Sequence, residues 1–211
     1  MVAAATGKNE KALRAEGIDY MVCHTHLASH ASYYPGSTEM TIKMLFTPDE
    51  GKVLGAQIVG YDGVDKRIDI VAVAIRAGMN VFDVQELELA YAPPFSSAKD
   101  PINMTAYVAG NMVNGSVETI CWDEVADRAA AGSFLLDVRT VKEFQDGAVE
   151  GAYNVPLDEI RDRMVEIPKD QEIMLYCRAG LRSYIGCRIL SQNDYKIKNI
   201  SGGYLTYEAL N

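Results

Sequence analysis

The feature that most constrains this sequence is the alternation of helical and strand-like segments in its C-terminal half. The strands are expected at residues 134–138, 172–176 and 197–200, and the helices at 122–131, 157–166 and 181–192. This alternation predicts an α/β domain in which helices flank a parallel sheet. In such sheets ligands bind at the carboxyl ends of strands, where a loop leads into the next helix.

The N-terminal half has a different pattern, which predicts an α+β domain. Strand-like runs joined by short turns predict an antiparallel meander, and they cover residues 20–29, 40–46 and 53–61. Apolar residues at helical spacing predict helices on one face of this sheet, at 64–77, 81–89 and 102–111. Turn-forming residues at 111–116 separate the halves, so we expect one domain over 1–112 and a second over 118–211.

Composition excludes several classes of protein. The chain has 211 residues with 20 Lys and Arg against 29 Asp and Glu, a formal net charge of −9, which disfavours binding to nucleic acid. No apolar run approaches the roughly 20 residues of a membrane span, and residues 1–17 do not resemble a signal peptide. We therefore expect a cytoplasmic protein without a membrane or nucleic-acid partner.

One cysteine lies where the predicted α/β fold would place a ligand. Cys177 follows the strand-like run 172–176 and precedes a helix that begins near Leu181. Free backbone N–H groups at the helix N-terminus, together with Arg178 and Arg182, favour a thiolate at this position. We therefore expect Cys177 to be an ionised, solvent-accessible nucleophile in a loop that also holds an anionic substrate.

The length of this loop helps to choose between reactions. Four residues separate Cys177 from Arg182, whereas a cysteine phosphatase or arsenate reductase would have five, and position 183 is Ser. The smaller ring of N–H groups favours one terminal sulfur atom over a phosphoryl group. The structural alternative, a buried inert thiol, is disfavoured because two flanking guanidinium groups would have no anionic partner.

The other cysteines and the histidines are not expected to carry chemistry. Cys187 lies roughly 10 Å along the predicted helix, too far for a disulfide with Cys177. Cys23 and Cys121 are interpreted as packing residues. His24, His26 and His30 have a spacing compatible with a metal site, but no acidic or cysteine ligand completes it, so we expect no metal.

Several ordered motifs in the second half resemble a single rhodanese domain. They are Leu136-Asp-Val-Arg139, Glu143-Phe144, Gly147-Ala-Val-Glu-Gly-Ala-Tyr-Asn-Val-Pro-Leu157, the loop Cys177-Arg-Ala-Gly-Leu-Arg182, and Gly202-Gly203. One departure is Ala148, where the family commonly has a histidine that is not the nucleophile.

The rhodanese resemblance implies sulfur transfer by double displacement. Cys177 would take the outer sulfur from thiosulfate, a polysulfide or a small persulfide, and an acceptor thiol would then remove it. No metal is needed. The loop residues would bind the substrate: Arg178, Ala179, Gly180, Leu181 and Arg182. Asp137 and Arg139 are expected to support neighbouring loops through buried hydrogen bonds.

The first half resembles the dimerisation domain of flavin-dependent pyridine nucleotide-disulfide oxidoreductases. The residues that carry the resemblance are His30-Ala-Ser-Tyr-Tyr-Pro-Gly36, Val53-Leu-Gly-Ala-Gln-Ile-Val-Gly60, Val64-Asp-Lys-Arg-Ile-Asp69 and Leu89-Ala-Tyr-Ala-Pro-Pro-Phe-Ser-Ser-Ala-Lys-Asp-Pro101. With a rhodanese domain attached, the chain is most similar to the coenzyme A-disulfide reductase subgroup. This resemblance implies a homodimer in which Tyr91 and one of Tyr33 and Tyr34 reach the other subunit's disulfide site.

The cofactor-binding motifs of that family are not found in these 211 residues. No G-x-G-x-x-G follows a strand, so nothing here is expected to hold FAD or NAD(P)H, which the resemblance assigns to the intact enzyme. We therefore expect the C-terminal portion of a coenzyme A-disulfide, persulfide or polysulfide reductase, with rhodanese activity of its own. The alternative is a non-catalytic module that only dimerises or docks partners.

Overall fold

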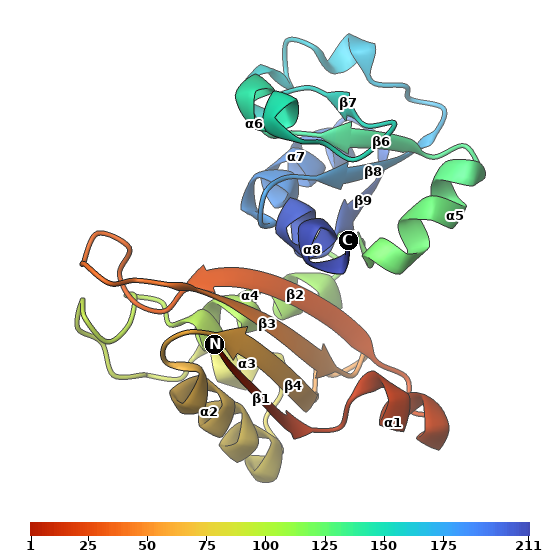
Figure 1. Ribbon diagram of the computed structural model, residues 1–211. Coiled ribbons are helices and arrows are strands. Elements are labelled where there is room, and N and C mark those ends of the chain that lie inside the picture. The colour runs from red at the N-terminus through yellow and green to blue at the C-terminus, as the bar shows by residue number, and fades with distance from the viewer. The chain divides into compact units, whose positions relative to one another are not determined.

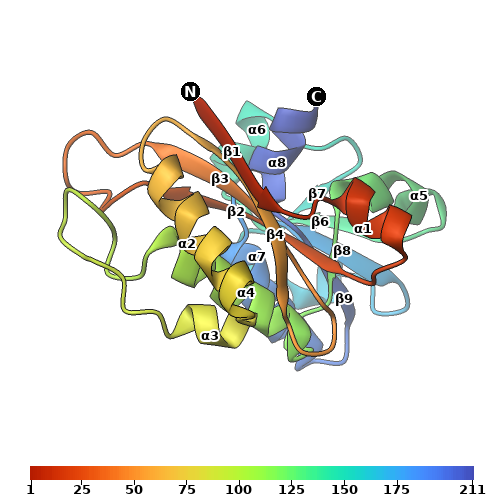
Figure 2. The same ribbon diagram turned by 90° about the horizontal axis from the view of Figure 1, so that it is seen from below.

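The computed structural model describes residues 1–211, which divide into two compact units, Met1–Asn114 and Gly115–Asn211. Figures 1 and 2 show the elements of each unit. Each unit is described separately. No helix is both long enough and apolar enough to cross a lipid bilayer.

The first unit is built on a four-stranded antiparallel sheet with the order β1-β4-β3-β2. Its strands are β1 (Val2–Gly7), β2 (Met21–Ala28), β3 (Glu39–Phe46) and β4 (Val53–Gly60). The predicted meander is confirmed as β2-β3-β4. Strand β1 and the short helix α1 (Glu10–Glu16) add to it and were not predicted, because their sequences carry no clear apolar alternation or stripe.

Helices cover one face of this sheet (Figure 2). Helix α2 (Val64–Ala77) lies against β1 and β4, and α4 (Pro101–Val113) lies against β2 and β3, with α3 (Val81–Gln85) beside α4. Apolar side chains of the strands meet those of the helices, and the fully buried members include Ile42, Met44, Ile58 and Ile102. The helix predicted over 81–89 ends at Gln85, where the chain turns into a loop.

The second unit is a five-stranded parallel sheet with the order β5-β9-β8-β6-β7. Its strands are β5 (Thr119–Ile120), β6 (Phe134–Asp137), β7 (Tyr153–Asn154), β8 (Glu172–Tyr176) and β9 (Lys196–Ile200). The helices are α5 (Val125–Ala130), α6 (Val141–Asp146), α7 (Leu181–Ser191) and α8 (Gly203–Leu210). An antiparallel α+β unit followed by a parallel α/β unit confirms the predicted fold class.

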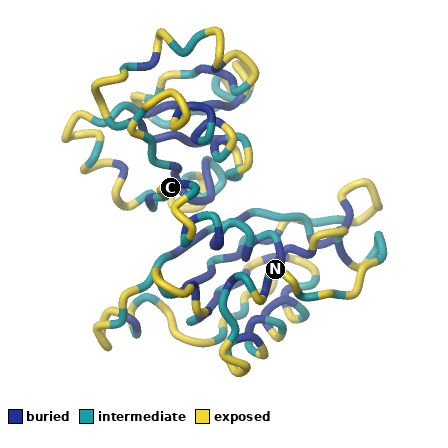
Figure 3. Tube along the Cα trace, turned by 180° about the vertical axis from the view of Figure 1, so that it is seen from behind, coloured by how far each residue is buried: buried dark blue, intermediate teal, exposed yellow.

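The two faces of the parallel sheet have separate cores. Alternate β8 residues point to opposite faces, as strand geometry requires. Met174 and Tyr176 pack with Ile120, Val125 and the partly buried Trp122 and Tyr204. On the other face Leu175 packs against α7, where a Cβ at Gly186 would lie only 3.2 Å from Leu175 Cδ1. Buried strands and exposed loops are distinguished by colour in Figure 3.

The helix predicted over residues 157–166 is wrong. That segment forms two separate 3-10 turns, η2 (Leu157–Glu159) and η3 (Met164–Glu166). The segment is attached to the rest of the unit by the buried Ile160 and, at the start of η3, by a hydrogen bond from Tyr195 Oη to the Met164 carbonyl, 2.9 Å. These contacts override the helical spacing of the apolar residues.

Candidate active site

Cys177 lies at the carboxyl end of β8, in the short loop that leads into α7. The backbone N–H of Gly180, the N-cap residue of α7, donates a hydrogen bond to Cys177 Sγ at 3.1 Å. The loop therefore turns back toward the sulfur atom of Cys177. Backbone N–H groups at the start of a helix stabilise negative charge, so this hydrogen bond favours a charged sulfur species.

The expectation that Cys177 is open to solvent is wrong in this structure. The residue is only 1 % exposed. Cys177 is buried because it directly follows β8, the middle strand of the sheet, and is surrounded by the neighbouring strands and by its own loop. Of the loop residues that follow it, Arg178 and Leu181 are exposed.

Helix α8 also forms hydrogen bonds with the Cys177 loop. The N-terminal N–H groups of α8 donate to the loop, from Tyr204 to the Cys177 carbonyl at 2.8 Å and from Leu205 to the Arg178 carbonyl at 3.0 Å. Gly203, just before them, has φ +58° and lies so close that a Cβ would be 2.4 Å from the Cys177 carbonyl oxygen. The sequence motif Gly202-Gly203 is thus part of the site.

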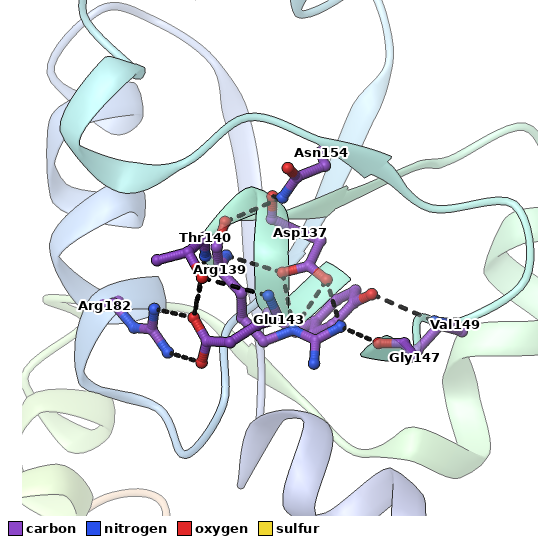
Figure 4. A network of polar contacts seen from close by, with 9 residues as sticks. Asp137, Arg139, Thr140, Glu143, Gly147, Val149, Asn154 and Arg182 are labelled. Carbon is purple, nitrogen blue, oxygen red and sulfur yellow. Dashed lines mark hydrogen bonds and ion pairs between the residues drawn. The ribbon is translucent and has the colours of Figure 1, made fainter. Parts of the chain in front are cut away.

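Arg182 is not a free cation at the mouth of the loop, in contrast to the expectation from sequence. Its guanidinium makes a bidentate ion pair with Glu143 of α6, with N–O distances of 2.7 and 2.6 Å (Figure 4). Glu143 also accepts hydrogen bonds from the backbone and hydroxyl of Thr140. The hydrogen bond from Arg182, opposed by burial and aided by Thr140, lowers the pKa of Glu143 to about 2.

Asp137 and Arg139 form a buried ion pair at the end of β6, beside the Cys177 loop. They are 0 % and 3 % exposed, and Arg139 Nη2 lies 2.8 Å from Asp137 Oδ2. Arg139 also donates to the Gly147 carbonyl at 2.7 Å, and Asn154 Nδ2 donates to the carbonyls of Asp137 and Arg139 (Figure 4). These contacts connect the end of β6 to Gly147, which follows α6, and to Asn154 of β7.

Aromatic rings enclose the Arg139 guanidinium. Its central carbon lies 3.8 Å from the ring centroid of Tyr204 in α8 and 5.6 Å from that of Tyr176. Burial, with Asp137 nearby, raises the pKa of the Tyr176 hydroxyl well above its ordinary range. The same cation thereby packs against the strand that carries Cys177 and the helix that holds its loop.

The remaining cysteines lie outside this site. Cys187 is 2 % exposed on α7, and burial raises the pKa of its thiol far above the ordinary value, so it is a poor nucleophile. Cys23 is buried in β2, near the Thr105 carbonyl of α4. Cys121 is partly exposed, and none of the four cysteines forms a disulfide.

In the first unit the structure brings two of the three singled-out tyrosines together. The hydroxyl oxygens of Tyr33 and Tyr91 are 3.2 Å apart, although 58 residues separate them in sequence. Tyr34 instead packs edge to face on His30, with ring centroids 5.9 Å apart. Tyr33 and Tyr91 are 75 % and 50 % exposed, so the pair lies at the surface of the unit.

The three histidines have separate environments. His24 and His26 lie on the same face of β2, where His26 Nδ1 is 3.0 Å from Thr41 Oγ1. Burial, followed by the charge of Lys43, lowers the pKa of His24 to about 4. His30 is buried in the following loop, next to the Ala31 carbonyl. No group of three or more His, Cys, Asp or Glu side chains is arranged to hold a metal ion.

The chain does not offer a site that fits a flavin or nicotinamide dinucleotide. Such cofactors place their pyrophosphate on a glycine-rich turn between a parallel strand and a helix. Here the turn after β6 contains Val138, Arg139 and Thr140, and the turn after β8 is the Cys177 loop. Neither has the G-x-G-x-x-G fingerprint, and the second is occupied by the Cys177 side chain.

Sequence reasoning did not assign a site role to Glu143 or Arg67. One role of Glu143 has a local signal in the sequence. Thr140-Val-Lys-Glu143 is a capping box and predicts the start of α6. Its pairing with Arg182 depends on how α6 and α7 come together and has no local signal. Arg67 of α2 is a charged residue with 1 % exposure, and apart from Gly63 its partners are distant in sequence.

Comparison with known proteins gives two family matches. Residues 1–101 match the pyridine nucleotide-disulphide oxidoreductase dimerisation domain, and residues 122–210 match the rhodanese-like domain. Among curated relatives, coenzyme A disulfide reductase of Staphylococcus haemolyticus is 38 % identical over 94 residues, 44 % of this chain and 21 % of the relative. The same enzyme of Staphylococcus epidermidis is 39 % identical over 94 residues, 44 % of this chain and 22 % of the relative.

Two solved structures resemble nearly the whole chain. Reduced Bacillus anthracis CoADR-RHD is 48 % identical with a TM-score of 0.94, covering 96 % of this chain and 36 % of that one. A NAD-dependent persulfide reductase from A. fulgidus is 37 % identical with a TM-score of 0.87, covering 96 % and 37 %. This chain therefore spans little more than a third of these proteins. Its first part matches the dimerisation domain of pyridine nucleotide-disulphide oxidoreductases, and its second part matches a rhodanese-like domain.

Proposed function

We propose that the second unit is a sulfurtransferase that carries sulfane sulfur on Cys177. The observation that carries the proposal is the hydrogen bond from the Gly180 N–H to Cys177 Sγ, at the start of α7. This geometry stabilises an anionic sulfur, which both the thiolate and a persulfide require. The rhodanese-like match over residues 122–210 supports the same chemistry.

The proposed reaction has two displacement steps and no net oxidation. The Cys177 thiolate attacks the outer sulfur of a donor such as thiosulfate or a persulfide. A sulfur–sulfur bond forms as the donor's own bond breaks, and sulfite or a thiolate leaves. An acceptor thiolate or cyanide then attacks the outer sulfur of the Cys177 persulfide, becomes a persulfide or thiocyanate, and releases the Cys177 thiolate.

The loop residues are proposed to bind the donor and the persulfide. The backbone of Ala179, Gly180, Leu181 and Arg182 surrounds the position of the outer sulfur, while the exposed Arg178 attracts an anionic donor. Arg182 contributes mainly by fixing the start of α7, because its guanidinium is paired with Glu143. Asp137 and Arg139 support the neighbouring loops.

Assay of the purified chain for thiocyanate release from thiosulfate and cyanide tests the proposal. Cys177→Ser is expected to abolish turnover, because a hydroxyl cannot form the persulfide. Cys187→Ser is the matched control, since it makes the same change at another buried cysteine and is expected to retain wild-type turnover. Equal loss in both variants would contradict the assignment of Cys177.

Mass spectrometry gives a second readout that does not depend on the acceptor. After incubation with a polysulfide, the peptide containing Cys177 is expected to gain the mass of one sulfur atom, and the peptide containing Cys187 is not. Because Cys177 is 1 % exposed, this labelling also tests whether the loop admits a donor. An unlabelled Cys177 in folded protein would favour a non-catalytic module.

For the first unit we propose that it forms a homodimer and serves a disulfide or persulfide reductase. The dimerisation-domain match and the exposed Tyr33–Tyr91 pair support this proposal. The FAD and NAD(P)H implied by the family would be held by other domains, since no turn of this chain fits them. Sedimentation equilibrium of the chain is expected to give twice the monomer mass, and a monomer at all concentrations would contradict the dimer.

A further inference from the structure

Three loops of the first unit meet at one buried cation. The Arg67 guanidinium on α2 donates to three backbone carbonyls, those of Ser29 at 2.8 Å, Gly63 at 3.2 Å and Phe95 at 3.4 Å. Arg67 is only 1 % exposed. A buried guanidinium is costly unless its N–H groups are satisfied, so this position is built around the cation.

Asp100 neutralises Arg67 and closes the network. Its carboxylate lies 3.0 Å from Arg67 Nη2, accepts from Ser96 Oγ at 2.7 Å, and caps α4 by accepting from the Ile102 N–H at 3.0 Å. Burial alone would raise the pKa of Asp100, but the hydrogen bonds and the Arg67 charge outweigh it and lower that pKa. The loop that ends at Asp100 is thus fixed to both α2 and α4.

The Arg67 guanidinium lies close against the backbone at Gly63. Gly63, the N-cap of α2, has φ +68°, and a Cβ there would lie 2.0 Å from Arg67 Nη1. The guanidinium therefore fills the space that a side chain at Gly63 would need. Its position is fixed by hydrogen bonds to Ser29, Gly63 and Asp100 on different sides.

The loops that Arg67 holds are those that carry the paired tyrosines. Tyr33 follows Ser29 by four residues, and Tyr91 precedes Phe95 by four. The two loops also touch through their backbones, since the Ala31 N–H lies 3.1 Å from the Ser96 carbonyl. Their bases are buried at Ser29 and Ser96, whereas both tyrosines are exposed.

We propose that Arg67 is the positioning residue for the Tyr33–Tyr91 hydroxyl pair. By bonding Ser29 in one loop and Phe95 and Asp100 in the other, it fixes the separation of the loops and so the approach of the two hydroxyls. Arginine suits this task because its planar fork directs several N–H groups at once, whereas lysine offers a single point of charge. The use of the pair by a reductase rests on the function proposed above, but the positioning does not.

The test is tyrosine-ring NMR on the whole chain, with signals assigned from Tyr33→Phe and Tyr91→Phe. The wild type is expected to show a cross-peak between the two rings, whose hydroxyls are 3.2 Å apart. The hydrogen bond with Tyr91 raises the pKa of Tyr33 above the usual value of about 10. In Arg67→Lys we expect the cross-peak to disappear and the Tyr33 pKa to fall to about 10.

Arg76→Lys is the matched control, because Arg76 is an exposed residue in the last turn of the same helix. It is expected to retain both the cross-peak and the raised Tyr33 pKa. If Arg67→Lys does not fold, Ser96→Ala replaces it. That variant removes a hydroxyl bonded to both Arg67 and Asp100 and is expected to weaken the cross-peak.

The proposal would be overturned if folded Arg67→Lys kept the cross-peak and the Tyr33 pKa of the wild type. Where Ser96→Ala replaces that variant, an unchanged cross-peak would overturn it. None of these readouts involves Cys177 or sulfur transfer. Failure of the positioning role is therefore distinguishable from failure of the proposed sulfurtransferase activity.

Discussion

At the scale of single residues, Gly203 is the position where the backbone leaves least freedom near the candidate nucleophile. Its φ of +58° is one that L side chains rarely adopt, and a Cβ would approach the Cys177 and Arg178 carbonyl oxygens to 2.4 and 2.9 Å. These oxygens accept the N–H groups of Tyr204 and Leu205. A side chain at residue 203 would therefore push α8 away from the loop that holds Cys177.

Gly203→Ala is accordingly expected to lower the free energy of unfolding of the second unit by about 3 kcal/mol, from backbone strain and from the contact with the loop. Thiocyanate release is expected to fall with it. Urea unfolding can be followed by fluorescence of Trp122, the single tryptophan, whose indole N–H donates to the Gly203 carbonyl at 2.9 Å.

Gly151→Ala separates the two causes. Gly151 also has a positive φ, +78°, but nothing lies within 4 Å of the position of its Cβ. We expect this variant to lose only about 1 kcal/mol and to keep its activity. A similar loss in both variants would show that contact with the Cys177 loop is unimportant.

The sequence predicted the site residues unevenly, and the reason is whether their signal is local. The position of Cys177 in a loop could be predicted from the sequence, because the strand, the loop and the helix follow each other along a short stretch of chain. The burial of Cys177 was not predicted, because burial depends on the neighbouring strands of the sheet. The pairing of Arg182 with Glu143 was not predicted either, because the two residues lie 39 positions apart in sequence.

At the scale of elements, the ion pair of Glu143 with Arg182 joins α6 to the first turn of α7, which also borders the Cys177 loop. Helix α6 has only six residues and none of them is buried, so its position depends on such polar contacts. Glu143 serves both as the third residue of its capping box and as the partner of Arg182. Its protonation should therefore affect both helices.

Glu143→Gln is expected to make the stability of the second unit less dependent on pH. The pKa of Glu143 is lowered from 4.5 to about 2, so its contribution is fully present above pH 4.5 and lost as pH falls toward 2. At neutral pH we expect the variant to lose about 1 kcal/mol, because the pair is partly exposed. Urea unfolding followed by Trp122 fluorescence between about pH 6 and about pH 2, a range that includes the titration of Glu143, measures the difference in unfolding free energy.

Glu150→Gln makes the same chemical change at an exposed carboxylate. Its stability difference from the wild type is expected to be small and constant across the same pH range. If Glu143→Gln behaved in the same way, the carboxylate of Glu143 would not be the group that stabilises the arrangement of α6 and α7.

Elements were predicted well where one apolar stripe or run decides the structure. Helix α2 and strand β8 have the predicted bounds, because each has a buried face matched to its period. The segment 157–166 has apolar residues at helical spacing but forms η2 and η3 instead. Its residues are held by tertiary contacts, among them a hydrogen bond from Tyr153 Oη to Glu166 at 2.6 Å. Such contacts cannot be predicted from a local sequence pattern.

At the scale of the whole molecule, each unit contains its own core and its own candidate site. The Cys177 loop is supported by α6, α7 and α8 of the second unit, and the Tyr33–Tyr91 pair is supported by the Arg67–Asp100 network of the first. We therefore expect changes in one unit to leave the stability of the other unchanged.

Asp100→Asn provides the test, because it leaves the buried Arg67 without its counter-charge. Side-chain exposure of this pair is 2 % on each partner, so the loss is expected to be about 3 kcal/mol, confined to the first unit. In urea, far-UV circular dichroism should show an earlier transition for the first unit, while the Trp122 fluorescence midpoint stays at its wild-type value. Trp122 belongs to the second unit, so an equal shift of its midpoint would mean that the two units unfold as one cooperative block.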